Sequence, residues 1–214
     1  MKENKYDDNI FFFFFSQMSR SQKGLAGAGE WETLRKLLPD FKDKRVLDLG
    51  CGYGWHCIYA MEHGASSVVG VDISHKMLEV AKEKTHFPQV EYKCCAIEDV
   101  EFPEESFDVI LSSLAFHYVA DYEILVKKIY RILKSGGKLV FTVEHPVFTA
   151  YGTQDWHYNE KGEILHFPVD NYYYEGKRTA VFLGEKVTKY HRTLTTYLNT
   201  LLSNGFIINH IVEP

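Results

Sequence analysis

The stretch from residue 45 to residue 59 constrains the fold of this chain more than any other. It opens with an apolar run at 46–49, the pattern of a strand buried on both faces of a parallel sheet. Three alternate glycines follow, Gly50, Gly52 and Gly54, where the backbone can take positive φ and approach a ligand closely. A helix is expected over 55–63. A strand, a glycine-rich turn and a helix in this order predict the nucleotide-binding half of a doubly wound α/β fold.

A second apolar strand is expected over 67–72, and it ends in the carboxylate of Asp72. The spacing between the glycines and Asp72 is typical of an acidic residue that accepts hydrogen bonds from the two ribose hydroxyls of a nucleoside. No Lys-Ser or Lys-Thr pair follows Gly54, which excludes a phosphate-binding P-loop. The ligand is therefore expected to bind through a ribose rather than through a phosphate cradle.

Asp48 narrows the choice of ligand, because it lies inside the strand end just before the glycines. Dinucleotide sites leave this neighbourhood uncharged, since the pyrophosphate brings negative charge there. A carboxylate suits a ligand with a cationic head, such as the amino group and sulfonium of S-adenosylmethionine. Two alternatives stay open at this point: an NAD-dependent oxidoreductase on a Rossmann fold, and a noncatalytic module that binds S-adenosylmethionine.

Residues 46–54, Val-Leu-Asp-Leu-Gly-Cys-Gly-Tyr-Gly, resemble the first motif of the class I S-adenosylmethionine-dependent methyltransferases. The resemblance covers residues 43–145, through Asp72 and the segments 97–99, 106–108 and 133–137. The chain also resembles a bacterial small-molecule branch of that family, the type 11-like methyltransferases, through residues 20–31, 144–146 and 191–193. The resemblance implies a Rossmann-like, mostly parallel sheet. It also implies S-adenosylmethionine as cofactor, S-adenosylhomocysteine as product, and SN2 transfer of a methyl group to a small-molecule acceptor.

The resemblance further implies which residues bind the cofactor. They are Asp48, Gly50, Cys51, Gly52, Gly54, Asp72, Ile73, Ile97, Glu98, Ser113 and Leu114. Ala96 stands where the family commonly has an acidic residue for the adenine amino group, so adenine recognition is expected to rest on backbone atoms around Ile97 and Glu98. Arg20 is expected either to pair with the methionine carboxylate through a bidentate contact or to lie on the surface.

The connection over residues 146–192 is far longer than the usual few residues and is rich in aromatic side chains. Its alternating patches and its glycines predict short antiparallel hairpins. In the family, segments inserted here commonly form the acceptor pocket. His145 and His191 border the segment, and either is the most natural general base, because the unperturbed pKa of histidine is ~6.5. A purely structural role is the alternative for each.

The chain is expected to form one domain in four parts. Residues 1–42 form an N-terminal segment whose five phenylalanines, at 11–15, either dock on the core or close the cofactor site as a lid. Residues 43–145 form the S-adenosylmethionine-binding core, 146–192 an inserted acceptor-pocket cap, and 193–214 a helix and a strand that complete the core. Further helices are expected over 75–84, 122–133 and 195–203, and further strands over 90–95, 107–112, 138–144 and 206–212.

Charge and composition limit the partners. The net charge is −5 at pH 7 and no long basic run occurs, which argues against a nucleic-acid surface. No Asn-Pro-Pro or Asp-Pro-Pro follows the fourth strand, which favours a small molecule over the amines of nucleic acids. The four cysteines lack the spacing of a zinc site, and the apolar run at 10–15 is too short for a membrane span or a signal peptide. We expect a cytoplasmic monomer or homodimer with no metal, nucleic-acid or membrane partner.

Overall fold

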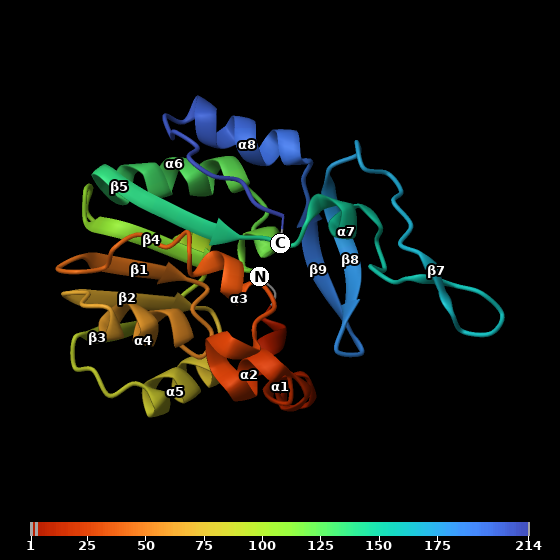
Figure 1. Cartoon of the computed structure of the whole chain (residues 1–214), viewed down its shortest axis with the longest axis horizontal. Coiled ribbons are helices and arrows are strands. Elements are labelled where there is room, and N and C mark those ends of the chain that lie inside the picture. The colour runs from red at the N-terminus through yellow and green to blue at the C-terminus, as the bar shows by residue number, and fades with distance from the viewer. Residues whose placement is uncertain (1, 3, 214) are drawn as a thin grey trace.

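A computed structural model of the chain describes residues 2 and 4–213. Its core is a five-stranded parallel sheet with the strand order β3-β2-β1-β4-β5 (Figure 1). The strands are β1 (Arg45–Leu49), β2 (Ser67–Asp72), β3 (Val90–Cys94), β4 (Phe107–Ser113) and β5 (Leu133–Thr142). The expected doubly wound, Rossmann-like sheet is confirmed. Its order reverses between β1 and β4, and ligands of such sheets bind at the carboxyl ends of the strands beside this switch point.

Helices cover both faces of the sheet, because its strands are apolar on both sides. They are α4 (Trp55–Glu62), α5 (His75–Lys84), α6 (Tyr122–Ile132) and α8 (Leu194–Ser203). Val46 belongs to a buried cluster with Cys57 of α4, whereas its neighbour Leu47 belongs to one with Ile129 of α6 and Leu201 of α8. This two-sided burial explains the continuous apolar run of β1. No helix in the described part of the chain combines the length and the apolar character that a bilayer span needs.

Local signals place most element boundaries where the sequence predicts them. Helix α5 starts at His75 because the Oγ atom of Ser74 accepts a hydrogen bond from the backbone N–H of Met77 at 3.1 Å. Strand β5 is an exception, since it begins at Leu133 rather than at residue 138. A register shift between Phe107 and Val109 of β4 takes up the intervening Ser-Gly-Gly turn, so that pairing starts earlier.

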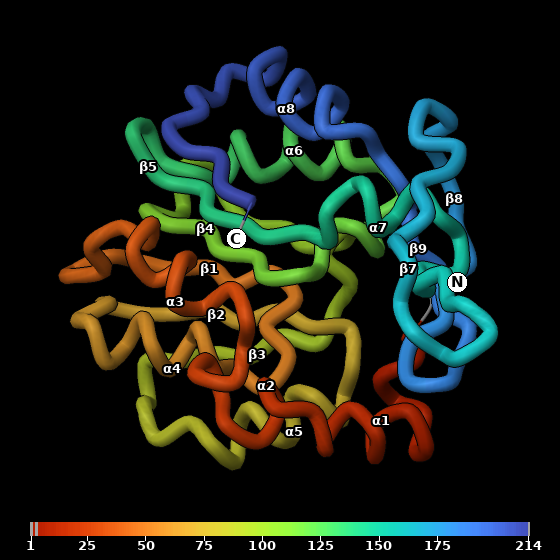
Figure 2. The backbone as a smooth tube through the Cα atoms, turned by 45° about the vertical axis from the view of Figure 1, so that its right-hand side comes forward, coloured from red at the N-terminus to blue at the C-terminus, as the bar shows by residue number. Residues whose placement is uncertain are grey.

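The N-terminal segment lies across the carboxyl ends of the strands, beside α5 (Figures 1 and 2). It contains η1 (Lys5–Asp7), α1 (Asn9–Ser16), α2 (Ser19–Lys23), η2 (Gly24–Gly27) and α3 (Trp31–Leu34). Of the phenylalanine run, Phe11 is fully buried, with its ring 5.1 Å from that of Tyr6 and 5.7 Å from that of Phe182, whereas Phe13 is 59% exposed. The run therefore docks through one side of α1.

The inserted segment forms the expected hairpins, which project beyond the sheet (Figure 1). After α7 (Pro146–Ala150) it folds into two antiparallel pairs, β6 (His157–Tyr158) with β7 (Ile164–His166), and β8 (Gly176–Phe182) with β9 (Glu185–His191). The second hairpin is tied to the N-terminal segment, because Ala180 and Val187 share a buried cluster with Phe11. The core, the hairpin and the N-terminal segment thus meet at one end of the molecule.

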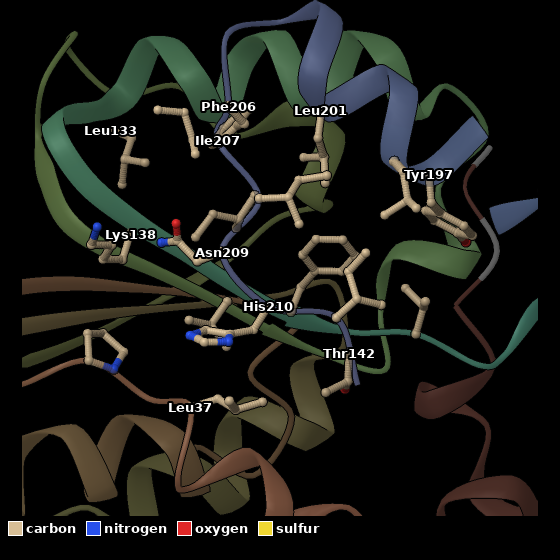
Figure 3. Close-up of a pocket in the computed structure, with 18 of the residues that line it drawn as sticks. Leu37, Leu133, Lys138, Thr142, Tyr197, Leu201, Phe206, Ile207, Asn209 and His210 are labelled. Atoms are coloured by element: carbon tan, nitrogen blue, oxygen red, sulfur yellow. The ribbon is translucent and has the colours of Figure 1, made fainter. Parts of the chain in front are cut away.

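The sixth strand expected over 206–212 is wrong. Phe206 and Ile208 pack on the core and Ile207 is 87% exposed, so the alternation that suggested a strand does reflect one-sided burial. However, a cavity of about 1370 Å³ separates this segment from β5 (Figure 3). Residues 206–213 therefore form no ladder of hydrogen bonds with β5. We call this space the edge cavity. Alternation of apolar and polar residues shows which side chains are buried, whereas strand pairing also requires the segment to lie against the edge of the sheet.

Candidate active site

A second cavity, of about 590 Å³, opens where the sheet order reverses. It is lined by the glycine loop after β1, by Asp72 at the end of β2, by η3 (Ile97–Asp99) and η4 (Phe116–Tyr118), and by residues of the N-terminal segment and of the β8–β9 hairpin. We call it the loop cavity. Its volume lies within the range of about 300–1,000 Å³ that is usual for small-molecule sites.

The glycine loop holds its glycines for different reasons. All three have positive φ, at 78°, 52° and 74°. A Cβ atom at Gly50 would lie 2.5 Å from that of Ala115, and one at Gly54 would lie 2.1 Å from the hydroxyl of Tyr92, so packing excludes larger residues at both positions. At Gly52 no described atom lies within 4 Å of such a Cβ atom. The loop therefore leaves open space above Gly52, where a ligand can approach the backbone.

Asp72 is oriented by the backbone around it. Its Oδ2 atom accepts a hydrogen bond from the N–H of Gly52 and its Oδ1 atom accepts one from the N–H of Ser74, both at 2.9 Å. Burial raises the pKa of Asp72, and the two backbone donors oppose that effect. Since each carboxylate oxygen can accept more than one hydrogen bond, Asp72 can still receive a pair of hydroxyl groups from the cavity.

Asp48 lies beneath the loop and does not line the cavity. It is 1% exposed, its Oδ2 atom accepts a weak bond from the thiol of Cys57 at 3.5 Å, and its Oδ1 atom has no partner among the described residues. Burial, with a smaller effect from the charge of Asp72, raises the pKa of Asp48 to about 7. The direct contact with a cationic head that the sequence predicts is therefore not the arrangement seen.

The remaining predicted cofactor residues gather at the loop cavity, with one exception. Those on its wall are Arg20, Gly50, Cys51, Gly52, Asp72, Ile73, Ile97, Glu98, Ser113 and Leu114. Gly54 is the exception, since it lies under the loop against Tyr92. Arg20 is held loosely, with its Nη2 atom 3.3 Å from Glu30 Oε1 and 3.4 Å from Ser113 Oγ.

Two polar residues that sequence reasoning missed lie at the start of α4. The Nε2 atom of His56 and the Nε1 atom of Trp55 are buried and lack hydrogen-bond partners in the described structure, and both residues line the loop cavity near Arg20. Burial lowers the pKa of His56 to about 4, and Arg20 adds to the effect, so the imidazole is neutral at neutral pH. Unpaired buried polar atoms are costly, and an anionic group of a ligand would supply partners here. Nothing in the sequence distinguishes these two residues from ordinary helix residues.

Neither histidine expected as a general base lines the loop cavity. His145 Nε2 lies 2.5 Å from Glu213 Oε1, and His145 Nδ1 accepts a hydrogen bond from the N–H of Val147 as the cap of α7. His191 is fully buried, with Nδ1 2.8 Å from Thr149 Oγ1 and Nε2 2.8 Å from the carbonyl of Tyr172. Both nitrogens of each imidazole are engaged: those of His191 bind the inserted segment, whereas those of His145 join α7 to Glu213 of the C-terminal segment.

The polar group of the cavity wall on the side of β5 is instead Glu144, another residue that was missed. Its Oε1 atom lies 2.5 Å from Lys189 Nζ and 3.9 Å from His117 Nε2, and its Oε2 atom accepts a hydrogen bond from Gln154 at 2.8 Å. Burial would raise the pKa of Glu144, but the neighbouring charges, chiefly Lys189 at neutral pH, outweigh it and the pKa is lowered. Burial lowers the pKa of His117 to about 4, so the imidazole is neutral. Glu144 is therefore ionised. Within the described residues no cluster of three histidine, cysteine or acidic side chains could hold a metal ion.

Comparisons with known proteins agree with this geometry. Residues 47–141 match the family described as a methyltransferase domain. The structure superposes on a Listeria monocytogenes protein, described in its crystal structure as a proposed S-adenosylmethionine-dependent methyltransferase, with 58% identity, 87% of each chain covered and a TM-score of 0.84. An S-adenosylmethionine-dependent methyltransferase from Mesorhizobium loti gives 42% identity, coverage of 87% of this chain and 85% of the other, and a TM-score of 0.81.

A further relative is the ubiquinone biosynthesis O-methyltransferase of Coxiella burnetii. It is 36% identical over 112 residues, which make up 51% of this chain. The match spans 47% of that relative, about half of its length.

Proposed function

The chain belongs to the class I S-adenosylmethionine-dependent methyltransferases, and from this premise we propose that it methylates a small molecule inside the loop cavity. It is an enzyme, and its cofactor is S-adenosylmethionine, so the NAD-dependent alternative is not retained. The observation that carries the proposal is the shape of the site. One cavity runs from Asp72 and the glycine loop to Glu144, Tyr118 and the β8–β9 hairpin, and the N-terminal segment closes it.

The residues at the glycine-loop end fit this cofactor. Asp72 would receive the ribose hydroxyls, and Ile73, Ile97 and Glu98 would surround the adenine. Arg20 and the unpaired nitrogens of His56 and Trp55 would receive the carboxylate of the methionine moiety, which satisfies buried atoms that are otherwise without partners. The open space above Gly52 admits the ligand against the loop backbone.

The chemistry divides between cofactor and protein. When bound, the cofactor supplies a methyl group on a sulfonium, which is already a strong electrophile. The protein's part is to hold the acceptor in line with that group, exclude water and receive a proton. Orientation alone can account for about 7–11 kcal/mol of the barrier. Tyr6 contributes to enclosure, since it lines the cavity and burial of its phenol raises its pKa to about 12.

Three observations support a small acceptor over a macromolecule. The cavity is covered by the N-terminal segment and the hairpin, the chain has a net charge of −5, and a curated relative is named as an O-methyltransferase of ubiquinone biosynthesis. The inserted residues 146–192 supply the wall on the acceptor side, and we propose them as the acceptor-pocket cap.

The test is to follow a labelled methyl group. The purified protein is incubated with S-adenosylmethionine carrying a trideuterated methyl and, separately, with small-molecule, RNA and protein fractions of a bacterial extract. The proposal predicts label in the small-molecule fraction. Label confined to RNA or protein would overturn it.

A further inference from the structure

The ends of the strands place Glu144 and Asp72 at opposite ends of one site. Glu144 follows β5, Ser113 ends β4, the glycine loop follows β1 and Asp72 ends β2, and these strands are adjacent in that order. Tyr6 lines the same cavity as both carboxylates, and its hydroxyl lies 3.3 Å from that of Tyr118. If the ribose of the cofactor binds Asp72, the space that remains for the acceptor is the end of the cavity that contains Glu144.

Glu144 is held rigidly in the cavity wall. Lys189 Nζ and Gln154 Nε2 each bind one carboxylate oxygen, and Lys189 also donates to Gln154 Oε1 at 2.8 Å, which closes a triangle of hydrogen bonds. The side chain of Lys189 is 3% exposed, whereas that of Glu144 is 27% exposed. Since an ionised carboxylate offers about four lone-pair sites, Glu144 keeps acceptor capacity that faces the cavity.

Lys189 determines which charge this end of the site accepts. Its ammonium neutralises Glu144 and lies 6.0 Å from the ring centre of Tyr118 and 5.6 Å from that of Phe182, so it already occupies the faces that would otherwise attract a cation. A second ammonium would find the carboxylate of Glu144 already paired with Lys189, and an anion would meet that carboxylate on the cavity wall. The surrounding walls are the rings of Tyr6, Tyr118, Phe182 and Tyr190. The end of the site therefore suits an uncharged, flat ring that carries a hydrogen-bond donor.

We infer that the acceptor is the hydroxyl of an uncharged aromatic ring, and that Glu144 receives its proton. The acceptor oxygen forms a bond to the methyl carbon, the bond between that carbon and the sulfonium sulfur breaks with its electron pair going to sulfur, and the hydroxyl proton passes to a carboxylate oxygen of Glu144. The products are a methyl ether and S-adenosylhomocysteine, and the proton leaves Glu144 for solvent. A weakly basic carboxylate suffices, because an alkylated hydroxyl is a strong acid. It would not deprotonate an ammonium. This inference rests on the proposed function.

The first test measures binding alone. The protein is saturated with S-adenosylhomocysteine and titrated by calorimetry with three probes of one size: 4-methylphenol, benzylammonium and benzoate. Catechol and 4-methoxyphenol extend the phenol set. Saturable binding of phenols, with at least tenfold weaker binding of benzylammonium and benzoate, is expected. Failure of every phenol to bind, or equal binding of benzylammonium, would overturn the inference. Failure of S-adenosylhomocysteine itself to bind would instead overturn the proposed function.

Variants assign the effect to the two residues. Lys189→Met should reverse the preference, so that benzylammonium binds at least tenfold better than in the wild type, because the charge of Glu144 is left unbalanced.

Glu144→Gln should leave the affinity for S-adenosylhomocysteine unchanged and lower kcat with a bound phenol by about 10²–10⁴-fold. The double variant Lys189→Met/Glu144→Gln carries neither charge, so no unpaired charge is left buried to destabilise the fold. It should show no preference for benzylammonium. A cation preference in the double variant, or full turnover by Glu144→Gln, would contradict the assignment.

Discussion

Two carboxylates close to the glycine loop differ in role because their surroundings differ. Asp72 accepts two backbone hydrogen bonds and reaches the cavity, whereas Asp48 has a single thiol partner and no access to it. Burial raises the pKa of both, and that of Asp48 rises to about 7. We therefore propose Asp72 for cofactor recognition and expect Asp48 to influence stability.

Replacing Asp72 by Asn should weaken the binding of S-adenosylhomocysteine by about 10- to 150-fold. The change removes the charge from hydrogen bonds that are worth about 1.5–3 kcal/mol. Isothermal titration calorimetry measures the effect, and Asp170→Asn, an exposed site in the inserted segment, is the matched control. Wild-type affinity in a folded Asp72→Asn protein would remove Asp72 from the ribose site.

Asp48 predicts a pH dependence of stability. Its pKa in the folded protein is about 7 and its ordinary value is 3.8, so folding favours the protonated form. Its contribution is fully present below pH 3.8 and is lost as the pH rises through 7. Between pH 5 and pH 8 the free energy of unfolding of the ligand-free wild type should fall by about 2–3 kcal/mol relative to Asp48→Asn. Urea denaturation of both proteins at both pH values measures this, and parallel pH profiles would show that Asp48 is not buried as a proton-binding group.

Sequence reasoning found the residues whose roles depend on local spacing and missed those whose roles depend on long-range packing. The glycine loop and Asp72 belong to one strand–loop–helix–strand unit, so their separation along the chain fixes their separation in space. Glu144 also follows a strand, but its role in the site depends on its ion pair with Lys189, which is 45 residues further along the chain. His145 and His191 are suggested by their chemistry alone, and long-range packing places neither of them on the wall of the loop cavity.

At the scale of elements, the N-terminal segment is the part whose docking the sequence could not specify. Five successive phenylalanines have no period, so they do not show which face of a helix is covered. The structure buries Phe11 between α1 and the β8–β9 hairpin and leaves Phe13 exposed. Helix α5, by contrast, follows from its Ser74 cap and its apolar stripe, which are local features. The strand expected over 206–212 does not form, because the edge cavity separates this segment from the free edge of β5.

Phe11→Ala should lower the free energy of unfolding by about 3–5 kcal/mol, because it leaves a cavity between α1 and the hairpin. Phe13→Ala, in the same run, should change it by less than about 0.5 kcal/mol. Chemical denaturation of the two variants compares them directly. Equal effects at both positions would show that α1 docks through a different face.

The contact between η1 and α5 should control how firmly the segment closes the site. Asp7 Oδ1 accepts hydrogen bonds from Ser74 Oγ at 2.6 Å and from the N–H of Lys76 at 3.1 Å. Asp7→Asn should therefore speed dissociation of S-adenosylhomocysteine several-fold in stopped-flow measurements. Asp8→Asn is the neighbouring control, because Asp8 caps α1 and Asn caps a helix equally well. Identical dissociation rates in the two variants would argue against Asp7 as a clasp.

At the scale of the whole molecule, function follows from how three parts meet at one edge of the sheet. The strand order sets Asp72, the glycine loop and Glu144 in a row along the carboxyl ends of the strands, and the hairpin and the N-terminal segment supply further walls of the cavity. The parallel sheet could be predicted from its motifs. The position of the hairpin could not, because it rests on contacts such as that of Phe182 with Phe11, which join distant parts of the chain.

The structure of the complex with S-adenosylhomocysteine tests this account most directly, because both the loop cavity and the edge cavity of the described chain are large enough to hold it. We predict that crystals of the complex show the ligand in the loop cavity, with its ribose on Asp72 and its sulfur directed toward the end that contains Glu144. A ligand in the edge cavity beside β5, or one in the loop cavity with its ribose away from Asp72, would contradict the account.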